Sequence, residues 1–316
     1  METVGSPGLW LGFFAFVGFM LALDLGVFHK NAHEITLKES AIWSTVWVSL
    51  AAVFCSGVYL LLGSNYALEF ATGFLIEKAL AVDNIFVFVV IFAAFGIPLV
   101  HQHRVLFWGI LGALVMRGAC VLVGGAFLQR FHWAIYVFGG VLALTGIKLI
   151  LQRNAVSDPS KNIAIRLFRR VIPVSQTLDG GRFFTKLRGR WVATPLFMAL
   201  LAVEVTDLIF AVDSIPAVFA ITKDPFIVFT SNIFAILGLR SLYFLLAGVI
   251  DRFHLLKLGL AAVLIFVGAK MMLLEVIKLP IAVSLGVIAA LLGGSIVASL
   301  VWPKLPKSDT VASKAA

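Results

Sequence analysis

Charged residues and cysteines are scarce in this sequence. Only 13% of its 316 residues are charged, whereas 61% are hydrophobic, and this composition excludes an ordinary soluble domain. The two cysteines, Cys55 and Cys120, lie in apolar runs without CxxC spacing, which excludes a disulfide framework and a zinc knuckle. No Gly-x-Gly-Asp motif occurs, so an intramembrane aspartyl protease is disfavoured, and we do not expect an enzyme.

Long apolar stretches fill most of the chain instead. A spanning helix needs about 20 mostly apolar residues, and we therefore predict a single all-α membrane domain over residues 1–316. The first stretch has no basic n-region and no cleavage pattern, so we expect a true span there and not a signal peptide. Nine stretches are predicted as spans: 8–28, 41–63, 68–95, 104–128, 133–151, 191–221, 226–250, 254–276 and 281–302.

The basic residues are distributed unevenly over the two sides that these spans define. One side carries 17 lysines and arginines, nine of them in the loop 152–190, and the other side carries three. Since the basic side faces the cytoplasm, we predict a bacterial inner-membrane protein with its N-terminus outside and its C-terminus inside. Topology thus explains the net charge of +9, and we expect no nucleic-acid partner. Within the loop, Ile163–Ile172 either lies on anionic membrane lipids or is a plain basic segment.

Two segments of the chain resemble one another. Both have the same pattern: an acidic residue, three further residues, Ala-Val-Asp, a small polar residue and Ile. An arginine, a glycine and a lysine then recur in the same order further along each segment. The matched pairs are Glu77 with Asp207, Asp83 with Asp213, Asn84 with Ser214, Arg117 with Arg240, Gly146 with Gly268 and Lys148 with Lys270.

These landmarks predict two units of three helices each. Repeat one covers 68–151 and repeat two covers 191–276, so spans 3–5 and 6–8 form the units. Units with an odd number of spans insert in opposite orientations, and such inverted repeats characterise secondary transporters. The alternative is a duplication that is kept only for packing. The remaining spans, 8–28, 41–63 and 281–302, flank the two units.

Several carboxylates lie within the predicted spans. A charge at mid-membrane costs about 2.5–3.5 kcal/mol on insertion scales, which favours a functional role over a structural one. These acids are Asp24, Glu77, Asp83, Glu204, Asp207 and Asp213. Two alternatives stay open: the acids are protonated, or they pair with buried bases. We expect Arg117, Arg240, Lys148 and Lys270 to form structural ion pairs.

The acids of one repeat do not share a face on a straight helix. Glu77 and Asp83 are six residues apart and differ by about 240° around the axis. Pro216 cannot donate a hydrogen bond to the carbonyl of Val212, so we predict a helix break there that leaves this oxygen free beside Asp213. Free carbonyls next to carboxylates are typical of cation sites at membrane depth.

The types of ligand atom restrict which cations can bind. Besides the carboxylates, Asn84 and Ser214 offer amide and hydroxyl oxygens, and all-oxygen sites suit Mg²⁺, Ca²⁺ and Mn²⁺. The histidines lie at span edges or in loops. His29 and His33, four residues apart, form either a weak entry site or part of a solvated loop.

The segments around the acids resemble a known family. Two segments are similar to the two signatures of the TerC family: Ile76–Phe88, with Glu-Lys-Ala-Leu-Ala-Val-Asp-Asn, and Val203–Thr222, with Ala-Val-Asp-Ser-Ile-Pro. The likeness continues in Asp224–Val228 and Thr230–Arg240. The likeness is greatest to its Alx branch. The resemblance implies an integral membrane protein associated with tellurium resistance, and for Alx-like members manganese export linked to alkaline conditions. It implies metal binding by Glu77, Asp83, Glu204, Asp207 and Asp213.

We therefore expect an exporter of divalent cations, Mn²⁺ first, that works by alternating access and is coupled to H⁺ or another cation. Mn²⁺ is then a transported substrate, and we expect no permanently bound cofactor. The alternative is a membrane scaffold or stress-resistance factor without transport. In the last span, Gly286, Ala290, Gly294 and Ala298 recur every four residues, which favours close helix packing within the monomer or in a homo-oligomer.

Overall fold

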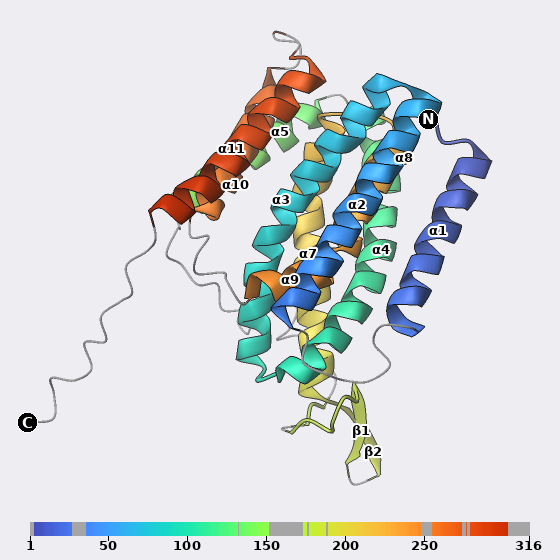
Figure 1. Cartoon of the computed structure of the whole chain (residues 1–316). Coiled ribbons are helices and arrows are strands. Elements are labelled where there is room, and N and C mark those ends of the chain that lie inside the picture. The colour runs from blue at the N-terminus through green and yellow to red at the C-terminus, as the bar shows by residue number, and fades with distance from the viewer. Residues whose placement is uncertain are drawn as a thin grey trace, which may run out of the picture.

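The computed structural model is a helical bundle with a small β-hairpin at one end (Figure 1). It describes residues 3–26, 36–131, 133–151, 173–175, 177–187, 189–247, 255–273, 276 and 279–302. The elements are α1 (Pro7–Gly26), α2 (Leu37–Leu62), α3 (Ser64–Ala94), α4 (Leu99–Arg130), α5 (Ala134–Leu151), β1 (Phe184–Leu187), β2 (Arg190–Ala193), α7 (Pro195–Phe219), α8 (Pro225–Leu237), α9 (Leu239–Ala247), α10 (Leu256–Met272) and α11 (Ile281–Val301).

Each predicted apolar stretch coincides with a helix, or with the bent pair α8 and α9, to within a few residues. Among the described helices, α2, α4, α7 and α11 are long and apolar enough to cross a membrane, and α8 with α9 makes a fifth span if the pair is counted as one. α3 has 31 residues but carries four charged side chains. The chain is thus an all-α membrane protein, and the count of nine spans stays a prediction.

The predicted span 191–221 begins too early. Residues Arg190–Ala193 form β2, which pairs antiparallel with β1 from Phe184↔Ala193 to Leu187↔Arg190. Gly189 supplies the left-handed backbone of the turn with a φ of 78°. Thr194 is extended, and Pro195 occupies the first turn of α7, where proline is favoured because its missing N–H needs no partner. Trp191, Val192 and Ala193 are apolar like the helix that follows, so hydropathy alone does not separate β2 from α7.

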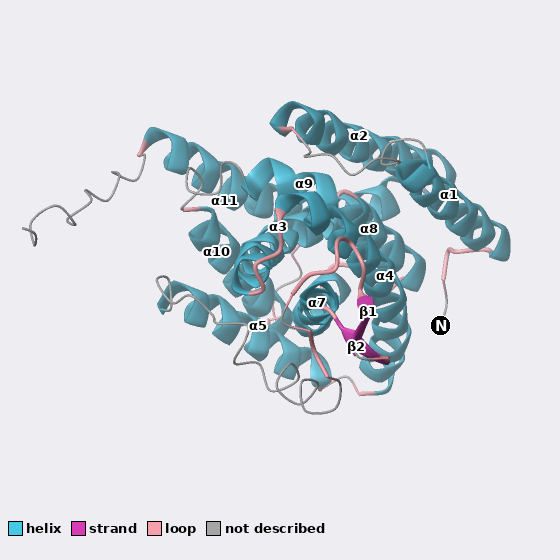
Figure 2. Ribbon diagram, turned by 90° about the horizontal axis from the view of Figure 1, so that it is seen from below, coloured by secondary structure: helices cyan, strands magenta, loops and turns pink. Residues whose placement is uncertain are grey.

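The helices of the two predicted repeats pack on one another in exchanged pairs. α3 packs against α8 and α4 against α7, while α5 packs against α10. α7 lies in the middle of the bundle beside α3 and α4 (Figure 2). A Cβ on Gly139 of α5 would lie 2.9 Å from the carbonyl oxygen of Gly268, and one on Gly146 would lie 2.7 Å from that of Ala261. These glycines therefore permit backbone contact between α5 and α10.

The second helix of the later unit is broken at Gly238. α8 and α9 meet there at a bend of 42°, and the Nζ of Lys78 on α3 donates a hydrogen bond to the carbonyl oxygen of Ala235 at 3.2 Å. A Cβ on Gly238 would lie 2.7 Å from this Nζ. The glycine thus lets the half-buried Lys78 reach the carbonyl end of α8, where positive charge is stabilising.

The apolar core is rich in aromatic rings. Phe13 of α1 and Phe54 of α2 meet Phe226 and Phe234 of α8 with ring centroids 4.9 to 6.5 Å apart. Asp224 caps the N-terminus of α8 by accepting from two backbone N–H groups, and it also accepts from Val4 N at 2.7 Å. α1 is therefore held to the bundle by rings and by the cap of α8.

Candidate functional site

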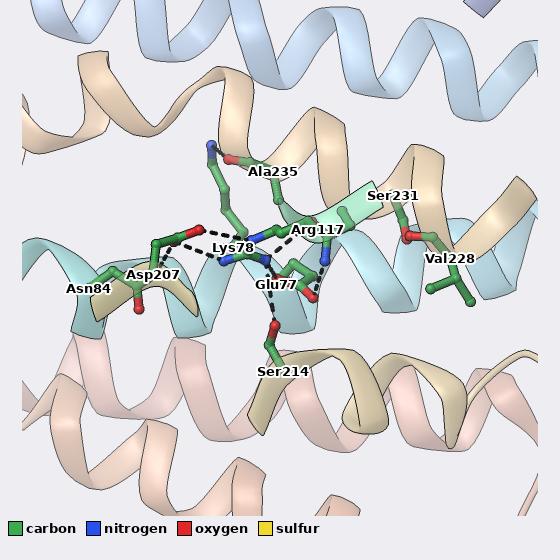
Figure 3. Close-up of polar contacts among 10 residues, drawn as sticks. Glu77, Lys78, Asn84, Arg117, Asp207, Ser214, Val228, Ser231 and Ala235 are labelled. Carbon is green, nitrogen blue, oxygen red and sulfur yellow. Dashed lines mark hydrogen bonds and ion pairs between the residues drawn. The ribbon is translucent and has the colours of Figure 1, made fainter. Parts of the chain in front are cut away.

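Arg117 of α4 joins acids from both predicted repeats. Its Nη1 lies 2.6 Å from Oε2 of Glu77 on α3. Its Nη2 donates to Oδ1 of Asp207 on α7 at 3.2 Å, and its Nε donates to Oδ2 of the same residue at 3.3 Å. All three side chains are at most 4% exposed. The matched acids of the repeat therefore meet at one guanidinium group inside the bundle (Figure 3).

Neutral side chains complete this cluster. The amide of Asn232 on α8 donates to Oε1 of Glu77 at 2.6 Å and accepts from Nη1 of Arg117 at 3.1 Å. The amide of Asn84 donates to Oδ1 of Asp207 at 3.3 Å, and Ser214 Oγ accepts from Arg117 at 3.4 Å. The arginine cluster, defined as Glu77, Asn84, Arg117, Asp207, Ser214 and Asn232, thus links α3, α4, α7 and α8.

Glu204 lies one turn before Asp207 on α7. Its Oε2 is buried and has no hydrogen-bond donor among the described residues, and the same holds for Oδ1 of Asn84. A Cβ on Gly112 of α4 would overlap the Glu204 carboxylate. Glycine at this position is therefore required for the carboxylate to lie against the backbone of α4.

Three predicted acids fall partly outside the described residues. The backbones of Asp24, Asp83 and Asp213 lie in α1, α3 and α7, but their side chains are outside the described set. His29, His33 and the segment 163–172 are also outside it. Metal binding by Asp83 and Asp213 therefore stays a prediction.

The helix break expected at Pro216 does not occur in the described backbone. α7 is helical from Pro195 to Phe219 with Pro216 inside it. The proline is only three residues from the end of the helix, and Ala220 N donates to Pro216 O at 3.0 Å. Pro216 has no N–H to donate to the carbonyl of Val212, but α7 stays helical on both sides of it, and α7 packs on α3 and α4. The expected helix break is therefore wrong.

Lys270 and Lys148 differ from Arg117 in their contacts with the described residues, and the ion pair expected for Arg240 stays a prediction. Lys270 of α10 donates from Nζ to Ser284 Oγ on α11 at 2.9 Å, so a hydroxyl group is its partner in the part of the chain that is described. Lys148 is exposed on α5, and no ion pair is found for it among the described residues. Arg240 is buried and lines a pocket of about 10 Å³ together with Asp207, about the minimum that holds one water molecule.

The described side chains do not form a ready metal site. No group of three or more His, Cys, Asp or Glu residues is placed to hold an ion within the described part of the chain. Every carboxylate oxygen of Glu77 and Asp207 already accepts a hydrogen bond. The cluster holds buried carboxylates from two helices, and an ion gains access to them only when the donors move.

Asn232 is the site residue that the sequence pattern missed. It lies in the Thr230–Arg240 segment and is fully buried, with a 2.6 Å hydrogen bond to Glu77. A polar amide in the middle of an apolar span was a usable signal, because such groups need a hydrogen-bond partner at membrane depth. Its matched position in repeat one gave no such hint.

The chain is similar to known membrane proteins over most of its length. Residues 62–306 match the model of the integral membrane protein TerC family. An uncharacterized membrane protein STKORF319 of Myxococcus xanthus is 60% identical over 99% of this chain and 100% of its own length. The putative membrane-bound redox modulator Alx of Escherichia coli K12 is 46% identical over 92% of this chain and 94% of its own length.

A membrane protein of Rickettsia felis is 40% identical over 92% of this chain. No solved structure matches the chain. The family match covers more than half of the chain, and the Alx-named relatives align over almost all of it. The chain therefore belongs to the TerC family of integral membrane proteins and is Alx-like within it.

Proposed function

We propose that this protein exports divalent metal cations, Mn²⁺ first, from the cytoplasm by alternating access of two inverted repeats. The observation that carries the proposal is the convergence of Glu77 and Asp207, matched acids of the two repeats, inside the bundle. Structural duplication alone does not call for charged groups at this depth, where each is costly. Binding of a transported cation accounts for both buried acids.

The balance of charge supports a cation as the substrate. Within the arginine cluster, Glu77 and Asp207 share the single guanidinium group of Arg117. Two carboxylates there meet one positive charge, before Glu204, Asp83 and Asp213 are counted. Their ligand atoms are all oxygen, which suits Mn²⁺, Mg²⁺ and Ca²⁺ better than Zn²⁺ or Cu²⁺. Among these three ions, the preference for Mn²⁺ rests on the resemblance to the Alx-like members of the TerC family.

The exchanged packing of helices supports the inverted repeat within one membrane domain. Gly146 and Gly268 are matched positions, and so are Gly139 and Ala261 at the same spacing. The contact of Gly139 with Gly268 corresponds to that of Ala261 with Gly146 when the units are swapped. A pair of contacts that exchange in this way is what a two-fold relation between two units produces. Repeats related like this place transport sites between them.

Transport assays on proteoliposomes test the proposal. Purified protein is expected to move Mn²⁺ across the membrane, and Asp207→Asn is expected to lower the rate by about tenfold or more because a buried charged partner is lost. Lys270→Gln, which changes a buried cation outside the arginine cluster, serves as the control. Equal rates in empty and protein-containing vesicles would exclude the exporter.

Parallel assays with Mg²⁺, Ca²⁺ and Zn²⁺ establish selectivity, and an imposed pH gradient tests coupling to H⁺.

A membrane scaffold or stress factor is the second candidate. The observation that favours it is the ion pairing of Glu77 and Asp207 to Arg117, since such a network is also a means of holding four helices together. Asp213→Asn in a strain that lacks other manganese exporters separates the two. A scaffold tolerates this change, whereas an exporter loses protection against manganese although the variant is still present in the membrane.

A further inference from the structure

Arg117 occupies the place that a cation would take in the arginine cluster. Its three nitrogens reach both oxygens of Asp207 and one oxygen of Glu77. The fourth oxygen, Oε1 of Glu77, accepts from Asn232. All four carboxylate oxygens therefore have donors, and a divalent ion at about 2.0–2.6 Å from the same oxygens is sterically and electrostatically incompatible with the guanidinium.

The arginine also bridges the two repeats. Glu77 and Arg117 belong to repeat one, whereas Asp207 belongs to repeat two, and the contacts of Arg117 with Asp207 form two parallel hydrogen bonds. A two-pronged guanidinium–carboxylate pair has a fixed geometry. It therefore holds α4 and α7 in one relative position for as long as Asp207 is bound to it.

We propose that Arg117 is a tethered counter-cation that the transported divalent ion displaces from Glu77 and Asp207, which couples ion binding to release of the contact between the repeats. This inference rests on the proposed function, because it assigns a role to Arg117 in the same site. In the empty protein the guanidinium offsets one of the two negative charges of Glu77 and Asp207. In the loaded protein the ion takes over this charge.

The displaced side chain has other partners within its reach. Nη1 of Arg117 already donates to Oδ1 of Asn232 at 3.1 Å and lies 3.4 Å from Ser214 Oγ. These neutral acceptors keep the guanidinium satisfied when an ion draws the carboxylates away. Oδ1 of Asn84 and Oε2 of Glu204, which have no donor among the described residues, are then available to complete an all-oxygen shell around the ion.

The arrangement has a consequence for the transport cycle. Two bare carboxylates are costly at membrane depth, so an empty carrier without an internal cation must bind another ion before it changes orientation. Arg117 supplies one positive charge from within the chain. The return step of the empty carrier therefore needs no second divalent ion on Glu77 and Asp207, and coupling to H⁺ stays compatible with it.

Binding of Mn²⁺ to purified protein in detergent tests the inference. Isothermal titration calorimetry is done on the wild type, Arg117→Gln, Arg117→Lys and the control Lys270→Gln. Arg117→Gln removes the competitor and is expected to bind Mn²⁺ about tenfold more tightly or better. Arg117→Lys keeps one charge without the two-pronged contact and is expected to fall between that variant and the wild type. Lys270→Gln should bind like the wild type.

The possible results separate this inference from the proposed function. If the wild type binds Mn²⁺ and the folded Arg117 variants bind equally or more weakly, Arg117 is structural and the inference fails while the exporter stands. If neither the wild type nor any variant binds Mn²⁺, Mg²⁺ or Ca²⁺, the proposed function fails with it. Should Arg117→Gln not fold, Arg117→Lys alone decides, since unchanged or weaker binding by this variant contradicts displacement.

Thermal unfolding gives a second readout that does not depend on transport. Arg117→Gln leaves Glu77 and Asp207 without a cationic partner. A bound ion should therefore stabilise this variant against unfolding more than it stabilises the wild type. We expect Mn²⁺ to raise the unfolding temperature of Arg117→Gln more than that of the wild type at the same concentration. An equal or smaller increase in the variant overturns the inference.

Discussion

The environment of Glu204 depends on Gly112, a residue of the neighbouring helix α4. Its carboxylate lies against the backbone of α4 at Gly112, where a Cβ would overlap it. One of its oxygens is buried without a donor among the described residues. A side chain in this state is poorly stabilised in the empty protein, and a bound cation would stabilise it.

Gly112→Ala is therefore expected to push the Glu204 carboxylate aside. The carboxylate is the end of a flexible side chain, so it moves more easily than α4, and alanine itself favours a helix by about 0.5–1 kcal/mol over glycine. We predict unfolding stability close to that of the wild type but Mn²⁺ affinity lowered by about tenfold. Calorimetry and thermal melts in detergent measure the two quantities.

The control for this change lies in the same helix. A Cβ on Gly124 would meet Ile215 at 3.8 Å, an ordinary contact, so Gly124→Ala should leave the affinity unchanged. In Glu204→Ala the overlap no longer exists, and adding Gly112→Ala to it should have no further effect because the two changes act on one group. Additive losses in the double variant would show that Gly112 acts elsewhere.

The sequence indicated which residues belong to the site more readily than it indicated which side chains contact one another. The repeat identified Glu77, Arg117 and Asp207, but a pattern along the chain does not tell which side chains meet across helices. The 2.6 Å contact of Asn232 with Glu77 joins residues 155 positions apart. Such a contact depends on helix rotation and crossing, which hydropathy does not encode.

At the scale of elements, the helices were predictable because bilayer thickness sets their length. α2, Leu37–Leu62, and α11, Ile281–Val301, follow their apolar runs closely. Two local features were not predictable from apolar runs alone. The strand β2 is apolar enough to continue the run of α7, and α7 continues through Pro216 without a break.

The interface of α5 and α10 gives a prediction at this scale. A Cβ on Gly268 would lie 2.5 Å from the carbonyl oxygen of Gly139 and 2.6 Å from Ala143 N, and backbone atoms cannot shift without separating the helices. Gly268→Ala is expected to destabilise the protein by about 1–3 kcal/mol, as overpacking does. Chemical unfolding in detergent micelles measures the change.

Gly140 provides the comparison for this interface. It lies beside Gly139 on α5, yet a Cβ there would meet nothing within 4 Å. Gly140→Ala should be neutral or slightly stabilising, since alanine is the better helix former. If both changes had the same effect on stability, close backbone contact between α5 and α10 would not be what holds them together.

At the scale of the whole molecule, the uneven basic charge predicts which end of the bundle faces the cytoplasm. The hairpin β1–β2 lies at one end of the bundle and the turn between α7 and α8 lies at the other (Figure 1). Lys186 is exposed on the hairpin and Lys223 is exposed in that turn. Since α7 is long and apolar enough to cross a membrane, these two lysines should lie on opposite sides.

Cysteine labelling from one side tests this arrangement, because only Cys55 and Cys120 need to be replaced first. In that background, Lys223→Cys should react with a membrane-impermeant maleimide on intact spheroplasts. Lys186→Cys should react only after the membrane is made permeable, since the basic loop that contains it is expected inside. Permeabilised cells, in which both positions should react, control for access. Labelling of both cysteines from outside would mean that α7 does not cross the membrane, and the two repeats would then not be inserted in opposite directions.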